Sequence, residues 1–324
     1  MTGGTVTAVI PNWNKADLLG TVLADLAHQT HPVERTIVVD NASADRSAEI
    51  AERSGATLIR LSRNKGFAYA VNRGIEACAT DWVLILNNDV RFGTDWLRTM
   101  METAMAAGAW FAVGKLRSAA RPGLLDGTFD AVSRAGTSWR CGNGRPDGPV
   151  WSSGREIAFA PLTATLVRRE LFDRIGLLDE SFESYLEDVD FGLRCAAGHY
   201  TGVYVPSAVA DHAGSATLGA WHKATVRRIS RNQILLVRKH FRAAPRWPVL
   251  VGQLLWGLVA LRHGAGLAWF RGRLDGLRLN RAPAFQDWSA IRYAVERSEG
   301  EIRELQKATG YDLYWKLYFA LVRS

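Results

Sequence analysis

Two amides and a carboxylate follow directly after a run of apolar residues near position 86. The segment L-I-L-N-N-D-V spans residues 84–90, and Asn87, Asn88 and Asp89 end a run that is typical of a buried strand. A buried strand avoids an abrupt polar end unless that end faces water or a ligand. These residue types also favour turns through bonds to their own backbone, so a plain turn and a binding site are both open at this point.

The elements around this cluster alternate between short β-rich runs and helical stretches. Strands are expected over residues 6–10, 36–40, 56–61 and 82–86, with a helical stretch following each of the first three. This alternation is typical of βαβ units and a parallel sheet. Ligands of such sheets bind outside the carboxyl ends of the strands.

Each of the other three expected strands also ends in polar residues. The clusters are Pro11-Asn12-Trp13-Asn14, Asp40-Asn41-Ala42-Ser43 and Ser62-Arg63-Asn64-Lys65-Gly66. Parallel strands place their carboxyl ends at one edge, so these clusters and Asn87-Asn88-Asp89 should lie together. The pattern therefore predicts a binding face at this edge of the sheet.

The chain lacks the glycine-rich loops that bind phosphate in other α/β proteins. No G-x-G-x-x-G follows the first strand, and no G-x-x-x-x-G-K-[ST] occurs. A dinucleotide site and an NTPase phosphate loop are therefore not expected. A hard divalent cation on carboxylate oxygen is another way to neutralise phosphate, and Asp89 could supply that ligand.

Composition indicates an ordinary globular protein with one unusual charge feature. The 324 residues are 48% hydrophobic and 22% charged, and the net charge is +8. Residues 222–281 alone carry +12, whereas residues 1–221 total −4. The three cysteines show no metal-ligand spacing and no secretory signal precedes the first strand, so we expect reduced thiols and a cytoplasmic location.

The middle of the chain is less regular and then becomes acidic. Residues 114–156 are rich in Gly, Pro, Ser and Arg and are expected to form a long loop. The segment L-E-D-V-D-F-G-L-R-C at 186–195 has helical character, and the i, i+3 spacing places Glu187 and Asp190 on one helical face, so that Asp188 points elsewhere.

Seven ordered blocks across residues 5–217 resemble family 2 glycosyltransferases of the GT-A fold. They are similar above all to the bacterial branch that includes rhamnosyl- and galactofuranosyl-transferases. The blocks are V-I-P-N-W-N-K (9–15), V-V-D-N-A-S-A-D-R-S (38–47), R-N-K-G-F-A-Y-A-V-N-R-G (63–74), L-N-N-D-V (86–90), L-L-D-E-S-F (177–182), E-D-V-D-F-G-L-R (187–194) and H-A-G-S (212–215).

The resemblance implies a role for each matched position. Asp89 corresponds to the last residue of the D-x-D motif, which binds Mg²⁺ or Mn²⁺ at the donor diphosphate, and Asn87 replaces its first carboxylate. His212 corresponds to a position that can complete the metal shell. The residues that would bind the nucleotide-sugar are Pro11, Asn14, Asp40, Asn41, Asn64, Lys65, Gly66, Asn72, Asn88 and Asp89.

The resemblance also implies a catalytic base and an acceptor side. Asp188 matches the base that takes the proton of the acceptor hydroxyl, which implies direct displacement with inversion at the anomeric carbon. Glu187 would contact the acceptor or tune Asp188 through like-charge proximity. Trp151 could stack on a sugar of the acceptor, although large aromatic residues also simply fill cores.

The basic C-terminal part, residues 221–324, is expected to be mainly helical. The apolar stretch 247–261 is shorter than the ~20 residues that a membrane-spanning helix needs. Its tryptophans and the surrounding arginines suit a peripheral position on an anionic membrane surface, next to a polyprenyl-linked acceptor. A helix packed on the catalytic domain and an oligomer contact are alternatives. Nucleic-acid binding is not expected, because no known binding fold accompanies the charge.

Together these features predict an α/β GT-A domain over residues 1–220 with a helical extension over 221–324. Residues 1–113 would form its nucleotide-sugar half and 114–220 its acceptor half. The expected activity is metal-dependent, inverting transfer, with dTDP-rhamnose as the first donor and a UDP-hexose or UDP-galactofuranose as alternatives. A glycan, a lipid-linked glycan and a small molecule are possible acceptors. A catalytically silent sugar-nucleotide binder and a nucleotidyltransferase remain alternatives, though the glycine- and arginine-rich loop of the latter is absent.

Overall fold

The computed structural model describes residues 4–213, 221–279 and 288–322, and a ten-stranded mixed sheet lies at its centre. The main path of the sheet runs β10-β12-β6-β11-β4-β1-β2-β3. Its parallel part comprises β1 (Val6–Asn12), β2 (Arg35–Asp40), β3 (Thr57–Arg60) and β4 (Trp82–Leu86). The predicted parallel arrangement of the first four strands is confirmed.

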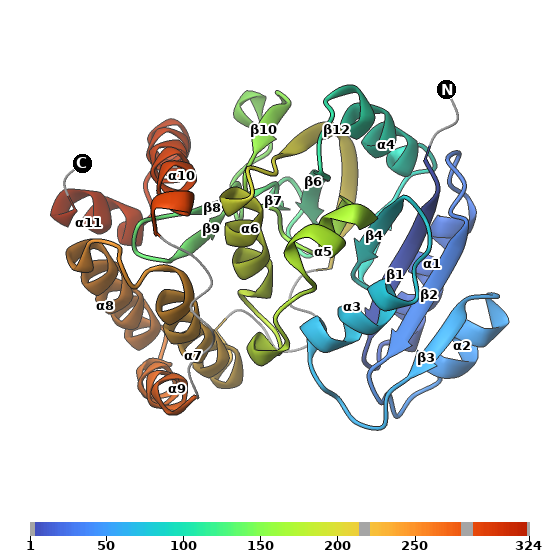
Figure 1. The fold of residues 1–324 in the computed structure, drawn as a ribbon, viewed down its shortest axis with the longest axis horizontal. Coiled ribbons are helices and arrows are strands. Elements are labelled where there is room, and N and C mark those ends of the chain that lie inside the picture. Colours follow the sequence, from blue (N-terminus) through green and yellow to red (C-terminus); the bar gives the residue numbers. More distant parts are fainter. Residues whose placement is uncertain (1–3, 214–220, 280–287, 323–324) are drawn as a thin grey trace.

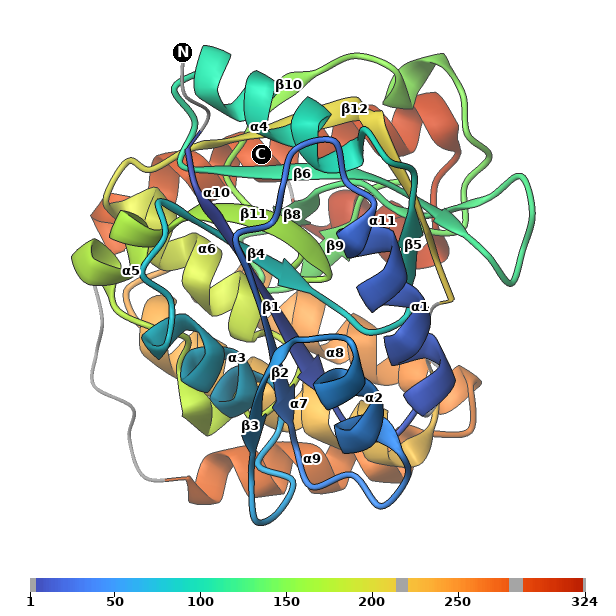
Figure 2. The ribbon, with the colours of Figure 1, turned by 90° about the vertical axis from the view of Figure 1, so that its right-hand side faces the viewer.

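Helices cover both faces of this parallel part (Figure 2). In that view α3 lies on one side of β1–β3, and α1 and α2 lie on the other. Side chains alternate accordingly along β1, since Val9 packs in the core on the α3 side and Ile10 in the core on the α1 side. These helices are α1 (Ala16–Ala27), α2 (Ser47–Arg53) and α3 (Phe67–Glu76).

The second half of the sheet is mixed: β11 runs antiparallel to β4 and to β6, whereas β6 and β12 run parallel to each other. The strands β8 and β9 form a separate two-stranded sheet. Residues 114–156, expected to be one long loop, instead contain several short paired segments, which the sequence did not reveal because strands of three residues are too short to show a periodicity. The strands are β5 (Val90–Phe92), β6 (Phe111–Ser118), β7 (Leu125–Gly127), β8 (Asp130–Val132), β9 (Ser138–Arg140), β10 (Arg155–Ile157), β11 (Ala164–Arg168) and β12 (Gly202–His212). The helical segments are α4 (Trp96–Ala106), η1 (Pro149–Trp151), α5 (Arg169–Ile175), η2 (Glu180–Phe182) and α6 (Glu187–Ala197).

The C-terminal part is helical, as predicted. In Figure 1 its helices gather at the end of the molecule opposite to β1–β3. They are α7 (Lys223–His240), α8 (Arg246–Arg262), α9 (Gly266–Arg278), α10 (Trp288–Thr309) and α11 (Leu313–Leu321). Within the described ranges, none of the helices is both long and apolar enough to cross a membrane.

The C-terminal helices share a hydrophobic core with the sheet. Val251 and Leu255 of α8 belong to the same buried cluster as Trp139 and Trp151. A Cβ at Gly252 would lie 2.3 Å from the Cβ of Ala135, so α8 approaches that segment closely. The predicted division at residue 220 falls within 214–220, outside the described residues, and remains a prediction.

Candidate active site

The carboxyl ends of β1, β2 and β4 meet at one edge, and Asn12 connects them. Asn12 and Asp40 are register partners in β1 and β2. The Nδ2 of Asn12 donates to Ser43 Oγ (3.3 Å), and its Oδ1 accepts from Asn88 Nδ2 (2.6 Å). Asn14, which belongs to the V-I-P-N-W-N-K block, lies in the turn after β1 and has a left-handed backbone conformation with φ 58°. Hydrogen bonds through Asn12, the residue after Pro11, thus join the polar clusters at the ends of β1, β2 and β4.

Asp40 brings a buried carboxylate to this edge. Its Oδ1 accepts a hydrogen bond from the backbone N–H of Ser43 (3.1 Å). Its Oδ2 is buried and has no hydrogen-bond partner among the residues described, although Arg60 Nε lies 3.7 Å away. An unsatisfied buried acceptor is costly, so this oxygen is suited to accept a hydrogen bond from a ligand.

The turn after β3 is shaped by amide side chains. Asn41 Nδ2 donates to the carbonyl of Gly66 (3.0 Å), and Asn41 Oδ1 accepts from the N–H of Lys65 (2.8 Å). Asn64 Oδ1 accepts from the N–H of Gly66 (2.9 Å). Gly66 has φ 88°, and a Cβ there would lie 2.6 Å from the carbonyl oxygen of Glu183. A side chain at this position would push the turn after β3 away from Glu183, in the segment before α6.

Two predicted site residues have contacts elsewhere. Asn72 is buried, and its amide both donates to the carbonyl of Leu178 (2.9 Å) and accepts from the N–H of Leu178 (3.0 Å). It therefore joins α3 to the chain before α6 instead of presenting its amide at the strand ends. Trp151 is 1% exposed and packs edge-on against Trp139, so it fills the core and is closed to an acceptor in this conformation.

Asp89 and His212 face each other, and Asp126 completes the arrangement. His212 Nε2 lies 3.0 Å from Asp89 Oδ1, and His212 Nδ1 lies 2.8 Å from Asp126 Oδ2. The backbone N–H of Ala213 also donates to the carbonyl of Asp89 (3.0 Å). Gly214 and Ser215, which complete the H-A-G-S block, lie outside the described residues. Asp126 lies on β7, and none of the sequence motifs includes it.

The two carboxylates determine the charge of His212. Burial alone would lower its pKa, but hydrogen bonds to Asp126 and Asp89 outweigh that effect and raise the pKa to about 9. Burial alone would raise the pKa of Asp126, but the hydrogen bond from His212 lowers it. His212 is therefore protonated at neutral pH and donates from both ring nitrogens.

This arrangement fits a divalent cation shared with a ligand. Asp126 holds Nδ1, which leaves Nε2 and the Asp89 carboxylate as neighbouring metal ligands once Nε2 loses its proton. A carboxylate with an imidazole suits Mn²⁺ better than Mg²⁺, which prefers oxygen alone. Across the described parts of the chain, no group of three or more His, Cys, Asp or Glu side chains could hold a metal. The remaining ligands would therefore come from bound diphosphate and water.

A cluster of acidic side chains surrounds Arg140 at the start of α6. Arg140 Nη2 lies 3.8 Å from Asp188 Oδ2, and its Nε donates to Asp130 Oδ1 (3.4 Å). Its Nη1 donates to Thr163 Oγ1 (3.2 Å). The charge of Asp126, the partner of His212, also acts on Arg140, so this guanidinium interacts electrostatically with both Asp126 and Asp188.

Burial and mutual repulsion raise the pKa values of these carboxyl groups. Burial raises the pKa of Asp130 to about 7, against the opposing charge of Arg140. Burial and then the charge of Asp188 raise the pKa of Glu187 well above its usual value. Burial also raises the pKa of Asp188, while Arg140 limits the rise. A carboxylate whose pKa lies above its usual range is a stronger base, as proton abstraction requires.

The backbone before α6 adopts an unusual conformation. Glu183, Tyr185 and Leu186 have φ values of 59°, 72° and 67°. Non-glycine residues rarely occupy this region, and such strain persists only where surrounding contacts impose it. Asn232 of α7 supplies them, since its Nδ2 is within hydrogen-bond distance of the carbonyls of Phe182, Ser184 and Tyr185 (2.8, 2.9 and 2.7 Å).

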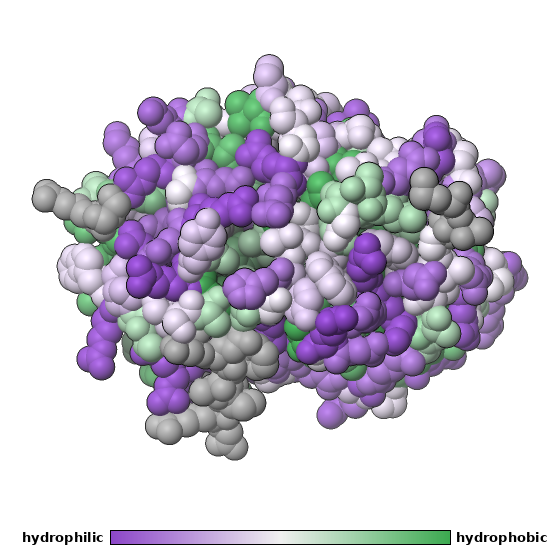
Figure 3. Space-filling view, turned by 45° about the horizontal axis from the view of Figure 1, so that its top comes forward, coloured by the Kyte–Doolittle hydropathy of each residue, from purple (hydrophilic) through white to green (hydrophobic). Residues whose placement is uncertain are grey.

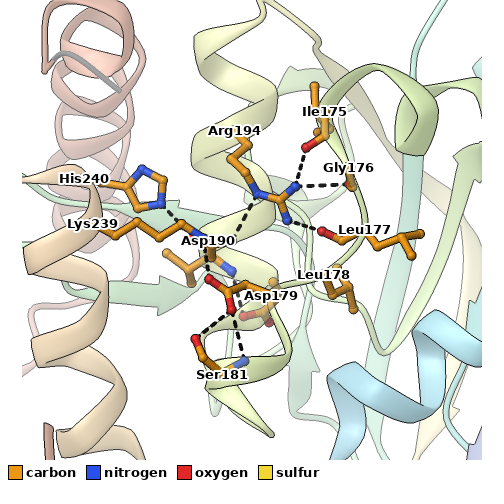
Figure 4. A network of polar contacts seen from close by, with 12 residues as sticks. Ile175, Gly176, Leu177, Leu178, Asp179, Ser181, Asp190, Arg194, Lys239 and His240 are labelled. Atoms are coloured by element: carbon orange, nitrogen blue, oxygen red, sulfur yellow. Dashed lines mark hydrogen bonds and ion pairs between the residues drawn. The ribbon is translucent and has the colours of Figure 1, made fainter. Parts of the chain in front are cut away.

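A buried ionic network also connects α6 with α7 (Figure 4). Asp190, on α6, is fully buried, and its Oδ1 lies 2.7 Å from His240 Nε2 and 2.8 Å from Lys239 Nζ. Its Oδ2 accepts from Arg194 Nε (3.1 Å). Lys239 also reaches Asp179 (2.6 Å). As the helical spacing predicts, Asp190 faces this network while Asp188 points to Arg140.

Comparison with known proteins identifies the family. The family model described as "Glycosyl transferase family 2" matches residues 7–176. The chain belongs to this family. N-acetylglucosaminyl-diphospho-decaprenol L-rhamnosyltransferase of Mycobacterium tuberculosis is 30% identical over 74% of this chain and 85% of its own length. The predicted relation of this glycosyltransferase to rhamnosyltransferases is thus confirmed.

Solved structures confirm the GT-A fold. GalNAc-T7 with UDP, GalNAc and Mn²⁺ has a TM-score of 0.63 and 13% identity, over 92% of this chain and 58% of that one. A mannosyltransferase of Pyrobaculum calidifontis, in complex with GDP-Man and Mn²⁺, has a TM-score of 0.51 and 16% identity, over 98% of this chain and 86% of that one. At these identities the likeness concerns the fold alone.

Four residues of this site were missed by sequence reasoning: Asp126, Asp130, Arg140 and Asn232. The first three lie in or beside the short strands of 114–156, where no motif marks them. The repeated acids of L-D-G-T-F-D at 125–130 were the one signal available. Asn232 lies in a basic helix beyond the recognised blocks and carries no local signal.

Proposed function

We propose that this glycosyltransferase moves a sugar, with inversion, from a nucleotide-diphospho-sugar to a hydroxyl of a lipid-linked glycan. The first donor to test is dTDP-L-rhamnose. The first acceptor class to test is N-acetylglucosaminyl-diphospho-polyprenol. The name of the M. tuberculosis relative includes an acceptor of this kind, N-acetylglucosaminyl-diphospho-decaprenol, and an L-rhamnosyl group. The observation that carries the proposal is the position of Arg140, whose Nη2 lies 3.8 Å from Asp188 Oδ2 and whose charge interacts with Asp126, the hydrogen-bond partner of His212.

In this proposal, the strand ends bind the nucleotide. The Oδ2 of Asp40 accepts a hydrogen bond from the base or ribose, because it is buried and lacks a protein partner among the residues described. Asn41, Asn64 and Gly66 hold the turn that encloses the nucleotide. Asp89 and His212 Nε2 would hold Mg²⁺ or Mn²⁺, which when bound stabilises negative charge on the leaving diphosphate.

Asp188 then acts as the general base. Its carboxylate takes the proton of the acceptor hydroxyl while the oxygen attacks the anomeric carbon. The bond from that carbon to the diphosphate oxygen breaks, and its electron pair leaves with the nucleotide diphosphate. A single displacement inverts the anomeric configuration. Burial raises the pKa of Asp188 and the charge of Arg140 opposes that rise, and Glu187, whose Oε2 is buried without a partner within the described ranges, lies on the acceptor side.

The test is a donor panel followed by mass spectrometry. UDP-, dTDP- and GDP-sugars are offered with Mn²⁺ or Mg²⁺ and a short-chain N-acetylglucosaminyl-diphospho-lipid, and the product's anomeric configuration is read by NMR. Wild type is compared with Asp188→Ala and Asp89→Ala. We expect one donor to give an inverted product and both substitutions to abolish it.

Asn87 in place of the first D-x-D carboxylate favours one competing account, a catalytically silent nucleotide-sugar binder. Binding of a nucleotide-sugar without turnover, for every donor and acceptor offered, would support that account and contradict transfer. A product with retained configuration would contradict the assigned single displacement.

A further inference from the structure

Helix α8 exposes an apolar stripe where a surface helix normally carries polar residues. The exposed fractions are 57% for Trp247, 52% for Leu250, 51% for Leu254, 58% for Leu258 and 64% for Leu261. These positions recur at three- and four-residue intervals and therefore lie along one side of the helix. Apart from Gln253, the buried residues of α8 are apolar or glycine, so α8 is apolar around most of its circumference although one side is open to solvent.

The neighbouring helices continue this pattern. On α9 the exposed apolar residues are Leu267, Phe270, Leu274 and Leu277, and on α11 they are Leu313, Leu317 and Leu321. Trp247 Nε1 donates to the carbonyl of Leu321 (3.0 Å), so the start of α8 meets the end of α11. By contrast, the face in Figure 3 is mostly hydrophilic, with hydrophobic residues in smaller separate patches.

The opposite faces of these helices are already fixed by close packing. A Cβ at Gly272 would lie 2.1 Å from the carbonyl oxygen of Arg227, and one at Gly276 would lie 2.7 Å from that of Arg231. The glycine face of α9 therefore presses against α7 and directs its leucines outward. Ala260 of α8 and Ala268 of α9 are buried in one small core. The exposed stripes are thus not core surfaces that a small rotation could bury.

Unpaired arginines accompany the stripes. Arg246 and Arg262 stand at the two ends of α8, and Arg271 and Arg278 lie on α9. All four are exposed, and none has an ion-pair partner among the residues that the structure describes. The arginines of α7 differ, since Arg227, for example, pairs with Asp275. Leucine-rich faces with free cations are typical of helices that lie in a membrane interface.

We infer that the exposed leucines of α8 and α9, with Arg246, Arg262, Arg271 and Arg278, form a docking surface for an anionic lipid bilayer. Charge complementarity selects this occupant, because the stretch 222–281 carries +12 and two such faces would repel each other in a symmetric dimer. The inference goes beyond sugar transfer and does not depend on it.

Vesicle co-sedimentation of the full chain, without donor or acceptor, tests the surface. Wild type should bind phosphatidylcholine vesicles that contain phosphatidylglycerol and bind pure phosphatidylcholine vesicles more weakly. Raising the salt to ~1 M should weaken binding, because the screening length falls to about 3 Å. We expect a loss of about tenfold or more in affinity for Leu250→Gln/Leu254→Gln/Leu258→Gln and for Arg262→Gln/Arg271→Gln/Arg278→Gln.

Two exposed substitutions on α10 serve as controls, Tyr293→Gln and Lys307→Gln, and should leave vesicle binding unchanged. The single change Leu258→Gln accompanies the triple variant in case the latter unfolds, and thermal melting checks each. Failure of wild type to bind anionic vesicles, or binding by either triple variant equal to that of wild type, would overturn the inference. So would a dimer, seen by light scattering, that the leucine variant converts to a monomer without any vesicle binding. Transfer to a water-soluble acceptor should survive the leucine changes, which separates this inference from the proposed activity.

Discussion

Two parts of the site are held in place in different ways. They are the edge where β1, β2 and β3 end, which we propose binds the nucleotide (the nucleotide edge), and α6, which carries the proposed base Asp188. At the nucleotide edge, turns are stabilised by amides that accept from backbone of the same edge, as Asn64 does from Gly66 two residues on and Asn41 from Lys65, 24 residues on. The segment before α6 depends instead on α7, through Asn232, which is separated from Ser184 by 48 residues, and His240, separated from Asp190 by 50. The C-terminal helix α7 therefore helps to hold α6 and the segment before it in place.

The electrostatics of the two halves differ as well. The nucleotide edge presents amides and a single buried carboxylate, Asp40, whose Oδ2 is left for a ligand. The half that carries the proposed base concentrates Asp130, Glu187 and Asp188 around Arg140, and burial raises the pKa of all three carboxyl groups against the opposing charge of Arg140. The comparison predicts that damage to α7 impairs catalysis and stability, whereas damage to the strand ends impairs donor binding.

The largest stability effect should come from Asp190→Asn, which breaks the link between α6 and α7. Removing one partner of a buried ionic network leaves His240 and Arg194 without their carboxylate and costs about 3–5 kcal/mol. Urea unfolding measures it, with the exposed Asp17→Asn on α1 as the matched control. A loss no larger than that of the control would contradict the role of the network.

The same residue predicts a pH effect. Burial alone would raise the pKa of Asp190, but the bond to His240 and the charges of Arg194 and Lys239 outweigh it and hold the pKa well below its usual value. The ionised group therefore stabilises the fold at pH values above about 4, and this contribution is lost as the pH falls below that value. Stability of Asp190→Asn should fall less steeply over that acidic range than stability of wild type.

How far the sequence predicts this molecule follows from the same contrast. The strand ends could be placed because local periodicity marks the strands and the polar residues follow each of them directly. Asp126 and Arg140 could not be placed, because they lie on three-residue strands that are too short to show a periodicity. The role of Trp151 was left open between stacking and packing, and only the packed core decides it. Asn232 could not be anticipated, since nothing local distinguishes it from a solvated residue on a basic helix.

Asn232→Leu sharpens the comparison by removing hydrogen bonds while keeping a side chain branched at Cγ with the same number of heavy atoms. The carbonyls of Phe182, Ser184 and Tyr185 would lose their donor, and stability should fall by about 3 kcal/mol. The strained segment would then hold Asp188 less well, so kcat should fall by about tenfold to a hundredfold. The KM for the donor should stay unchanged.

Steady-state kinetics measures kcat and the donor KM at a temperature at which circular dichroism shows that the variant is fully folded. Lys223→Gln, an exposed change on the same helix, is the control. A rise in donor KM with kcat preserved would show that α7 serves the nucleotide edge, and the comparison would fail.

Asp40→Asn tests the other half. The amide cannot replace both carboxylate oxygens as acceptors, so affinity for the donor nucleotide should fall by about tenfold, as expected for a hydrogen bond to a charged group. Stability should change little, because Oδ2 already lacks a hydrogen-bond partner among the described residues. Calorimetric titration with the nucleoside diphosphate measures it, and unchanged affinity would remove Asp40 from the binding site.

The smallest effect on turnover is expected for Trp151→Phe. The side chain is buried against Trp139, so a smaller ring should lower stability by about 1–2 kcal/mol through loss of packing. The KM for the acceptor should equal that of wild type. A raised acceptor KM at unchanged stability would restore the acceptor-side role that the sequence left open.

The central claim is that Asp188 is the base of a sugar transfer whose donor binds elsewhere on the sheet edge. The most direct measurement compares Asp188→Asn with wild type for both transfer rate and donor affinity. The account predicts a rate lowered by about 10²–10⁴-fold, the usual contribution of a general base, with donor affinity unchanged. A rate within a few fold of wild type would contradict it.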